Sequence, residues 1–250
     1  FDLFFFFFPD AEKDYSAEEI EKAKQKFALM TEEEITGVFQ NCMLGLPGSD
    51  DAFTAEQVLA ALKSYEGIDA KKLKEHLFYF FQQFIPVVDE CVLKMAIHPD
   101  DPPYSVLGLP RIMSTEQDAA DLIAAVPSQA NGFCFCTGSF GARPDNDLVK
   151  MIQRFGDHIH FLHLRNTKRD GGGNFYEANH LGGDADMYAI VKEVLLLMKR
   201  RDISLPMRPD HGHQMLDDLK KKTYPGYSAI GRLKGLAEIR GVEYALSRMT

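Results

Sequence analysis

The chain has 250 residues, of which 45% are hydrophobic, with 28 basic and 37 acidic side chains and a formal net charge of -9. This length and composition are typical of a globular protein that can bury a core, and they exclude a disordered chain, a collagen-like repeat and a disulfide scaffold. The acidic balance argues against nucleic acid or an anionic membrane as a partner, because both are bound through clustered Lys and Arg.

The first part of the chain, residues 1–91, is predicted to be mainly helical after an atypical start that is rich in phenylalanine. Phe4 to Phe8 form an unbroken aromatic run that ends at Pro9. The run is too short for a membrane span and lacks the basic leader of a signal peptide. It favours a buried strand, or an aggregation-prone edge, since five β-favouring residues follow one another without a charge.

Helices are expected throughout residues 16–91. Two starts are predicted by capping-box pairs, in which a side chain accepts from a free backbone donor of the first turn: Ser16 with Glu19, and Thr31 with Glu34. A third helix is expected from Thr54 through Leu62. A long apolar-periodic stretch from Asp69 toward Cys91 predicts a fourth, which Pro86 is expected to kink or divide. Its apolar residues at helical spacing are predicted to lie in the core: Leu73, Leu77, Phe80, Phe81 and Phe84.

Residues 92–250 are predicted to form four βα units. Short apolar segments indicate strands at Val92–Ile97, Gly132–Cys136, Ile159–Leu164 and Ser204–Arg208. Amphipathic segments indicate helices at Ser114–Ala125, Asp145–Phe155, Asp184–Arg201 and Tyr227–Leu246. Strands that alternate with helices in this way are typical of a parallel sheet or barrel.

Each predicted strand ends at a potential metal ligand: His98, Cys136, His163 and Asp210. In a parallel α/β sheet or barrel the carboxyl ends of the strands lie on one face, so these side chains should converge. Two imidazoles, one thiolate and one carboxylate can hold a divalent ion and leave positions for substrate oxygens. The sequence therefore predicts a metal site at the strand ends.

Side-chain alternation selects among the histidines of the third strand. His163 should point to the same face as Phe161 and Ile159, whereas His158 and His160 should point to the other. The identity of the metal stays open, because a thiolate favours Zn or Fe(II) over Mn(II), while the carboxylate favours Mn(II).

Proton-transfer groups are expected beside this site. His211 and His213 flank Gly212 next to Asp210, and Tyr227 follows at the start of the last helix. An imidazole titrates near neutrality and suits general acid or base catalysis, and Tyr227 could supply a second proton-transfer group.

Five strings of this sequence resemble the mannonate dehydratase family of hexuronate catabolism, over roughly residues 45–247. They are Met95–Pro103, Cys136–Ser139, His163–Asn166, Met207–His213 and Pro225–Arg232. The resemblance implies a TIM barrel related to xylose-isomerase-like barrels. It implies a cytoplasmic, homo-oligomeric enzyme that dehydrates the sugar acid D-mannonate to 2-keto-3-deoxy-D-gluconate with Mn(II) or Fe(II). The 4 cysteines, too few for an extracellular disulfide scaffold, agree with a reducing cytoplasm.

Carried over by position, the resemblance implies the metal ligands His98, Cys136, His163 and Asp210, and His211 with Tyr227 as the proton-transfer pair. Arg165 and Arg143 are candidates for binding the substrate carboxylate. A closed barrel needs eight strands, and only four βα units are clear here. A barrel that is incomplete at the amino terminus is therefore expected.

Two other functions stay open at this level. One is a sugar isomerase or epimerase of the xylose-isomerase type, which the single thiolate and the Asp210–His213 string disfavour. The other is a truncated, non-catalytic remnant that binds metal or partner subunits through an exposed sheet edge. The nature of the product separates the first from a dehydratase, and metal binding without turnover would indicate the second.

Overall fold

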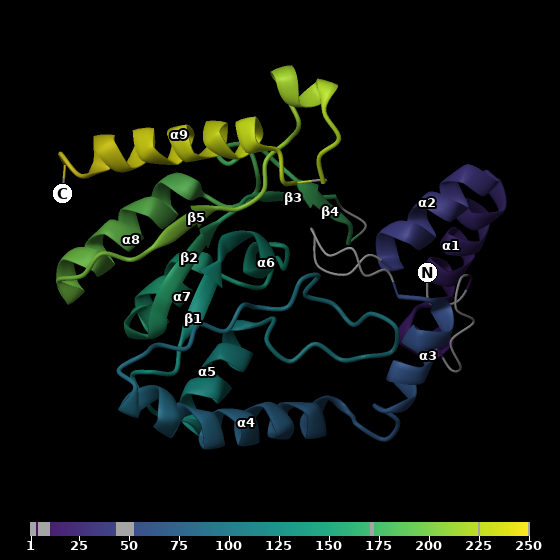
Figure 1. The fold of residues 1–250 in the computed structure, drawn as a ribbon, viewed down its shortest axis with the longest axis horizontal. Coiled ribbons are helices and arrows are strands. Elements are labelled where there is room, and N and C mark those ends of the chain that lie inside the picture. Colours follow the sequence, from purple (N-terminus) through teal and green to yellow (C-terminus); the bar gives the residue numbers. More distant parts are fainter. Residues whose placement is uncertain (1–3, 5–10, 44–52, 171–172, 225, 250) are drawn as a thin grey trace. The chain divides into compact units, whose positions relative to one another are not determined.

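The computed structural model describes residues 4, 11–43, 53–170, 173–224 and 226–249 (Figure 1). The chain divides into two units, residues 1–73 with 105–110 and residues 74–104 with 111–250. No helix within the described ranges combines the length and the apolar character that crossing a membrane requires.

The first unit is helical. It contains the 3-10 turn η1 (Ala11–Asp14) and the helices α1 (Ala17–Leu29), α2 (Glu32–Met43) and α3 (Ala55–Lys63). The three predicted helix starts are confirmed, because Ser16, Thr31 and Thr54 each accept a hydrogen bond from the backbone N–H three residues on. Phe4 lies in a turn and its ring stacks on Phe27 with centroids 5.3 Å apart. The rest of the phenylalanine run, predicted as a strand, lies outside the described residues.

Pro86 was predicted to kink or divide this helix; α4 (Ala70–Glu90) continues through it and is not divided. The missing N–H would have bonded to the Gln82 carbonyl, and Gln82 and Pro86 both lie at exposed positions, where water can bind this carbonyl. The prediction that Phe80 and Phe84 lie in the core was wrong. Phe81 is 2% exposed, whereas Phe80 and Phe84 are 50% and 44% exposed and stack on each other with centroids 5.4 Å apart.

The second unit is built on a parallel sheet with strand order β1 (Phe133–Cys136), β2 (Ile159–Leu164) and β5 (Met207–Pro209). The predicted strand Val92–Ile97 is present only as a short run beside β1. In that run Ile97 forms a parallel bridge with Phe133 and its N–H donates to the Gly132 carbonyl at 2.9 Å. Four segments therefore run side by side in the same direction.

The last strand begins later than predicted. β5 pairs with β2 from Met207 to Pro209, and the Pro206 carbonyl accepts from Leu162 at 3.0 Å. Pro206 has no N–H of its own, so the regular ladder starts after it. This shift leaves Asp210 directly beyond the strand end.

Four helices of the second unit follow the predicted order, with starts two or three residues later than expected: α5 (Glu116–Ala125), α7 (Leu148–Phe155), α8 (Met187–Arg201) and α9 (Ala229–Leu246). The delay has a common cause, because the capping side chain stands closer to each helix than predicted: Thr115, Asp147, Asp186 and Ser228. Sequence analysis missed the short helix α6 (Thr137–Gly141), the 3-10 turns η2 (Gly156–His158) and η3 (Leu216–Lys220), and the hairpin of β3 (Thr167–Arg169) and β4 (Phe175–Glu177).

The core of the second unit lies between the sheet and its helices. Helix α7 packs against α8, α8 packs against α9, and α9 also contacts β5, as Figure 1 shows. Fully buried side chains come from each layer: Leu122, Phe133, Phe135, Ile152, Ile190 and Ile239. Burial of one such side chain contributes about 1.5–3 kcal/mol. The packed core fixes the strands, and the strands fix the positions of the residues that follow them.

Asn131, which is fully buried just before β1, connects helix α5 to the sheet. Its Nδ2 donates to the carbonyls of Leu122 at 3.3 Å and Val126 at 2.9 Å at the end of that helix. We expect Asn131→Ala to lower the free energy of unfolding by about 1–3 kcal/mol, because buried carbonyls lose their donor. Urea unfolding followed by circular dichroism measures the change. Gln129→Ala, at an exposed position two residues away, is the control, and equal losses in the two variants would contradict this role.

Candidate metal and catalytic site

Three predicted ligands meet at the carboxyl ends of the strands. The parallel register pairs Cys136 with His163, and His98 follows the run beside β1. One ligand atom from each of these residues lies within 4.8 Å of the other two. His163 and His160 point to opposite faces of β2, as predicted, since His163 joins this group while the His160 ring packs against Gly132. Among the residues that the structure describes, this is the one group of three or more such side chains with metal-ligand spacing.

Cys136 is fully buried, and its surroundings stabilise the thiolate form. Its Sγ accepts from the Ser139 N–H at 3.5 Å and from the Ser139 hydroxyl at 3.3 Å, because Cys136 caps the first turn of α6. Burial raises the pKa of the thiol, but hydrogen bonds from His163, His98 and Ser139 outweigh burial and lower this pKa to about 6. A thiolate is the form of cysteine that binds a metal.

His98 presents one ring nitrogen to the group. Its Nδ1 lies 2.7 Å from the Pro99 carbonyl, which can only accept, so Nδ1 carries the hydrogen. Nε2 faces the group, 3.1 Å from His163 Nδ1, and it becomes a ligand when a metal displaces the proton that it donates to Cys136. A carbonyl that fixes the tautomer of a metal-binding histidine is a common arrangement in metalloproteins.

Asp210, the fourth predicted ligand, lies at the border of this group. Its Oδ2 is 3.7 Å from His163 Nδ1, and its Oδ1 accepts from Arg208 Nη2 at 2.7 Å. Burial raises the pKa of Asp210, but the charges of His211, Arg208 and His163 reverse this effect and hold the pKa below its usual value. The carboxylate is therefore ionised, with one oxygen facing His163.

These donors fit a divalent cation. Ligands about 2.0–2.3 Å from one ion span at most about 4.6 Å, so shifts of a few tenths of an ångström suffice here. Two imidazoles, a buried thiolate and a carboxylate are all deprotonated ligand types, and His98 and Cys136 are held by further hydrogen bonds. His98, Cys136, His163 and Asp210 are the residues that could hold the ion.

The predicted proton-transfer pair is also brought together. The rings of His211 and Tyr227 meet edge to face with centroids 5.3 Å apart, and His211 Nε2 lies 3.7 Å from Asp210 Oδ2. Ser228, next to Tyr227, is buried and donates to Asp218 at 2.6 Å, which fixes the start of α9. His213, in contrast, is exposed beyond this pair.

Arg165 and Arg143, the candidates for the substrate carboxylate, have carboxylate partners within the chain. Arg165 is 4% exposed and pairs with Asp101 and Glu177. Arg143 is more exposed and pairs with Asp145 at 2.5 Å. Substrate binding by either arginine stays a prediction.

Sequence analysis missed four residues that support the site: Asp101, Ser139, Glu177 and Arg208. Ser139 stands in the quoted Cys136–Ser139 string, and its spacing from Cys136 is that of a helix cap, so this contact could have been found. Glu177 lies in a strand of three residues without a flanking motif. Its Oε1 is 2.8 Å from His211 Nδ1, a contact that only the fold creates.

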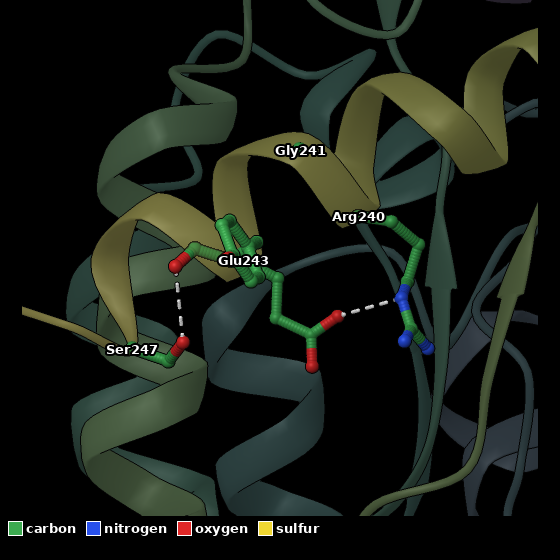
Figure 2. Close-up of a pocket in the computed structure, with 5 residues that line it drawn as sticks. Arg240, Gly241, Glu243 and Ser247 are labelled. Atoms are coloured by element: carbon green, nitrogen blue, oxygen red, sulfur yellow. Dashed lines mark hydrogen bonds and ion pairs between the residues drawn. The ribbon is translucent and has the colours of Figure 1, made fainter.

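Of two hollows in the surface, one lies away from the predicted site residues and the other adjoins them. The larger, about 410 Å³, lies along α9 and is lined by Arg240, Gly241, Glu243, Tyr244 and Ser247, where Figure 2 shows the Arg240–Glu243 ion pair. It contains no predicted site residue. A second hollow of about 250 Å³ is lined by Glu177, His213, Gln214 and Thr223 with two glycines, and it adjoins the site through Glu177.

Comparison with known proteins identifies the family of this chain. A sequence profile described as D-mannonate dehydratase (UxuA) matches residues 11–250. The chain belongs to the D-mannonate dehydratase family. It is 48% identical over 252 residues to the mannonate dehydratase of Marinomonas sp. (strain MWYL1), covering 98% of this chain. It is 46% identical over 244 residues to that of Saccharophagus degradans, covering 95% of this chain.

A solved structure supports the same family. The crystal structure of mannonate dehydratase from Streptococcus suis serotype 2 superposes with a TM-score of 0.71 at 35% identity, over 78% of this chain and 55% of that one. The chain spans 64% of the length of the Marinomonas relative and 62% of the length of the Saccharophagus relative.

Of the two cysteines of β1, we expect Cys136 and not Cys134 to bind the metal. Cys136→Ala is expected to weaken Co(II) binding by more than about tenfold and to abolish the thiolate-to-cobalt charge-transfer absorption, because the thiolate ligand is lost. Cys134→Ala is the matched control, since burial raises the pKa of the Cys134 thiol to about 12. Absorption lost in the Cys134 variant and kept in the Cys136 variant would contradict the assignment.

Proposed function

We propose that this chain carries the metal-binding and proton-transfer residues of a D-mannonate dehydratase, which converts D-mannonate to 2-keto-3-deoxy-D-gluconate in hexuronate catabolism. The observation that carries this proposal is the convergence of His98, Cys136 and His163, with Asp210 and His211 beside them, in a chain of that family. The residues come from three separate strand ends and adjacent loops. Their meeting point offers both a cation site and a proton-transfer group.

The donor set supports Mn(II) or Fe(II) as the metal. Fe(II) suits the thiolate and imidazoles, and Mn(II) suits the carboxylate of Asp210. When bound, such an ion supplies Lewis-acid stabilisation of negative charge on substrate oxygens. The residues that would hold it are His98, Cys136, His163 and Asp210.

His211 and Tyr227 divide the proton transfers in this proposal. Elimination removes the proton next to the substrate carboxylate and releases the neighbouring hydroxyl as water, so one group must accept a proton and another must donate one. The two rings are 5.3 Å apart, close enough to serve adjacent atoms of one substrate. Arg165, buried between Asp101 and Glu177, balances negative charge beside the site.

We further place the parallel sheet in a TIM barrel of the xylose-isomerase-like type. The support is the parallel strand order, the consecutive packing of α7, α8 and α9, and the ligands at one set of strand ends. A reducing cytoplasm is the proposed location, because the site uses a free thiol. A homo-oligomer is proposed as well, and the exposed rings of Phe80 and Phe84 on α4 support it.

Incubation of the chain with D-mannonate and Mn(II) is expected to yield a 2-keto acid, detected as its hydrazone, and EDTA should abolish the product. A ketose product would instead indicate an isomerase. Metal binding without any product would indicate a non-catalytic metal-binding chain.

His211→Gln and Tyr227→Phe should each lower kcat by about 10²–10⁴-fold, since each removes a proton-transfer group. Metal content, measured by elemental analysis, should stay unchanged, because neither residue belongs to the ligand set. His213→Gln is the matched control for the exposed neighbouring imidazole. Loss of metal from the His211 or Tyr227 variant would overturn these roles.

A further inference from the structure

We propose that Glu177 is a positioning residue for His211, whose carboxylate holds the imidazole in the tautomer with hydrogen on Nδ1 and leaves Nε2 free toward the metal site. This inference rests on the proposed function, in which His211 transfers a proton. It assigns a task to the strand β4, which the sequence did not predict.

The geometry defines the tautomer. Glu177 Oε1 lies 2.8 Å from His211 Nδ1, and an ionised carboxylate can only accept a hydrogen bond. The hydrogen must therefore be on Nδ1 whenever the imidazole is neutral. Nε2 lies on the other side of the ring, 3.7 Å from Asp210 Oδ2, where a substrate bound at the proposed metal site would be reached.

Arg165 fixes the position of the Glu177 carboxylate. Its Nε donates to Glu177 Oε1 at 2.7 Å, and its Nη2 donates to the same oxygen. Arg165 is itself 4% exposed, and its backbone is held by Thr137, whose hydroxyl accepts from the Arg165 N–H at 3.0 Å. A Cβ at Gly138 would clash with the stem of Arg165, so the Cys136–Ser139 turn has room for this arginine only because glycine stands there.

The pairing of the hairpin and the backbone of His211 bring the two partners together. Glu177 is opposite Thr167 in the β3–β4 ladder, and β3 starts three residues after β2 ends. His211 has a φ of +62°, a left-handed conformation that non-glycine residues rarely adopt. Its ring lies against Gly226 on one side and meets the Tyr227 ring edge to face. The orientation of the imidazole is thus determined by the backbone, by two neighbours and by Glu177.

A purely structural role would make Glu177 only an ion-pair partner of Arg165. The two roles differ in what they require of His211. If Glu177 positions His211, its loss changes the tautomer of His211 and the turnover number. If Glu177 only pairs with Arg165, its loss affects stability and leaves the His211 ring unchanged.

The first test measures the tautomer without turnover. Nitrogen-15 NMR of imidazole-labelled, Zn(II)-loaded protein at about pH 8, where an ordinary imidazole is neutral, is assigned by comparison with His211→Asn. We expect His211 to show a protonated Nδ1 and an unprotonated Nε2. Glu177→Ala should lose this single tautomer. A protonated Nε2 on His211 of the unaltered protein would overturn the inference, whether or not Glu177→Ala folds.

The second test uses kinetics with D-mannonate. Glu177→Ala, which removes the acceptor of the His211 Nδ1 hydrogen bond, should lower kcat by about 10²-fold. KM should change by less than about threefold, because substrate binding is retained. Added formate should restore part of the kcat of Glu177→Ala. Tyr176→Phe, at the exposed neighbouring position of β4, is the matched control.

The outcomes separate this inference from the proposed function. If the unaltered protein forms no 2-keto acid, the proposed function fails, and the NMR result still decides the tautomer. If the unaltered protein is active and Glu177→Ala keeps full kcat, the positioning role of Glu177 is overturned and the proposed function stands.

Discussion

The arrangement of this site depends on one parallel register, in which Cys136 of β1 stands opposite His163 of β2. Parallel strands end on the same edge, so this register places a thiol and an imidazole side by side, and the Ile97–Phe133 bridge adds His98. A slip of one residue would turn the alternate side chains, Phe135 or Leu162, into the site. The packed core opposes such a slip, because Phe135 and Leu162, which are 1% and 2% exposed, would lose their places in it.

Charge compensation governs what surrounds this register. The site gathers a thiolate, Asp210, Glu177 and Asp101 in a largely buried region, and buried charges are tolerated only when they are paired. Arg165 pairs with Asp101 and Glu177, and Arg208 pairs with Asp210. The same pairs fix geometry, since Asp210 and Glu177 each direct one oxygen toward a histidine. Charge balance and orientation thus come from the same contacts.

Prediction from sequence succeeded where the pattern is local. The strand Ile159–Leu164 and the three amino-terminal helix starts are found where expected, because alternation and capping boxes act within a few residues. It failed where distant contacts decide. The burial of Phe81 but not Phe80 depends on which face of α4 meets the core, and the start of β5 depends on its pairing with β2.

The sequence by itself determined the order of strands and helices and the ligand types at the strand ends, since periodicity and residue chemistry are written along the chain. It also determined the family, through strings that are local. Only the tertiary structure decided that Glu177 meets His211 and that Arg165 faces two carboxylates. Glu177 and His211 are 34 residues apart in the sequence, and Arg165 is 12 residues from Glu177 and 64 from Asp101. No local sequence pattern encodes contacts over such separations. Their approach follows from the packing of the sheet, the β3–β4 hairpin and the turn at Gly138.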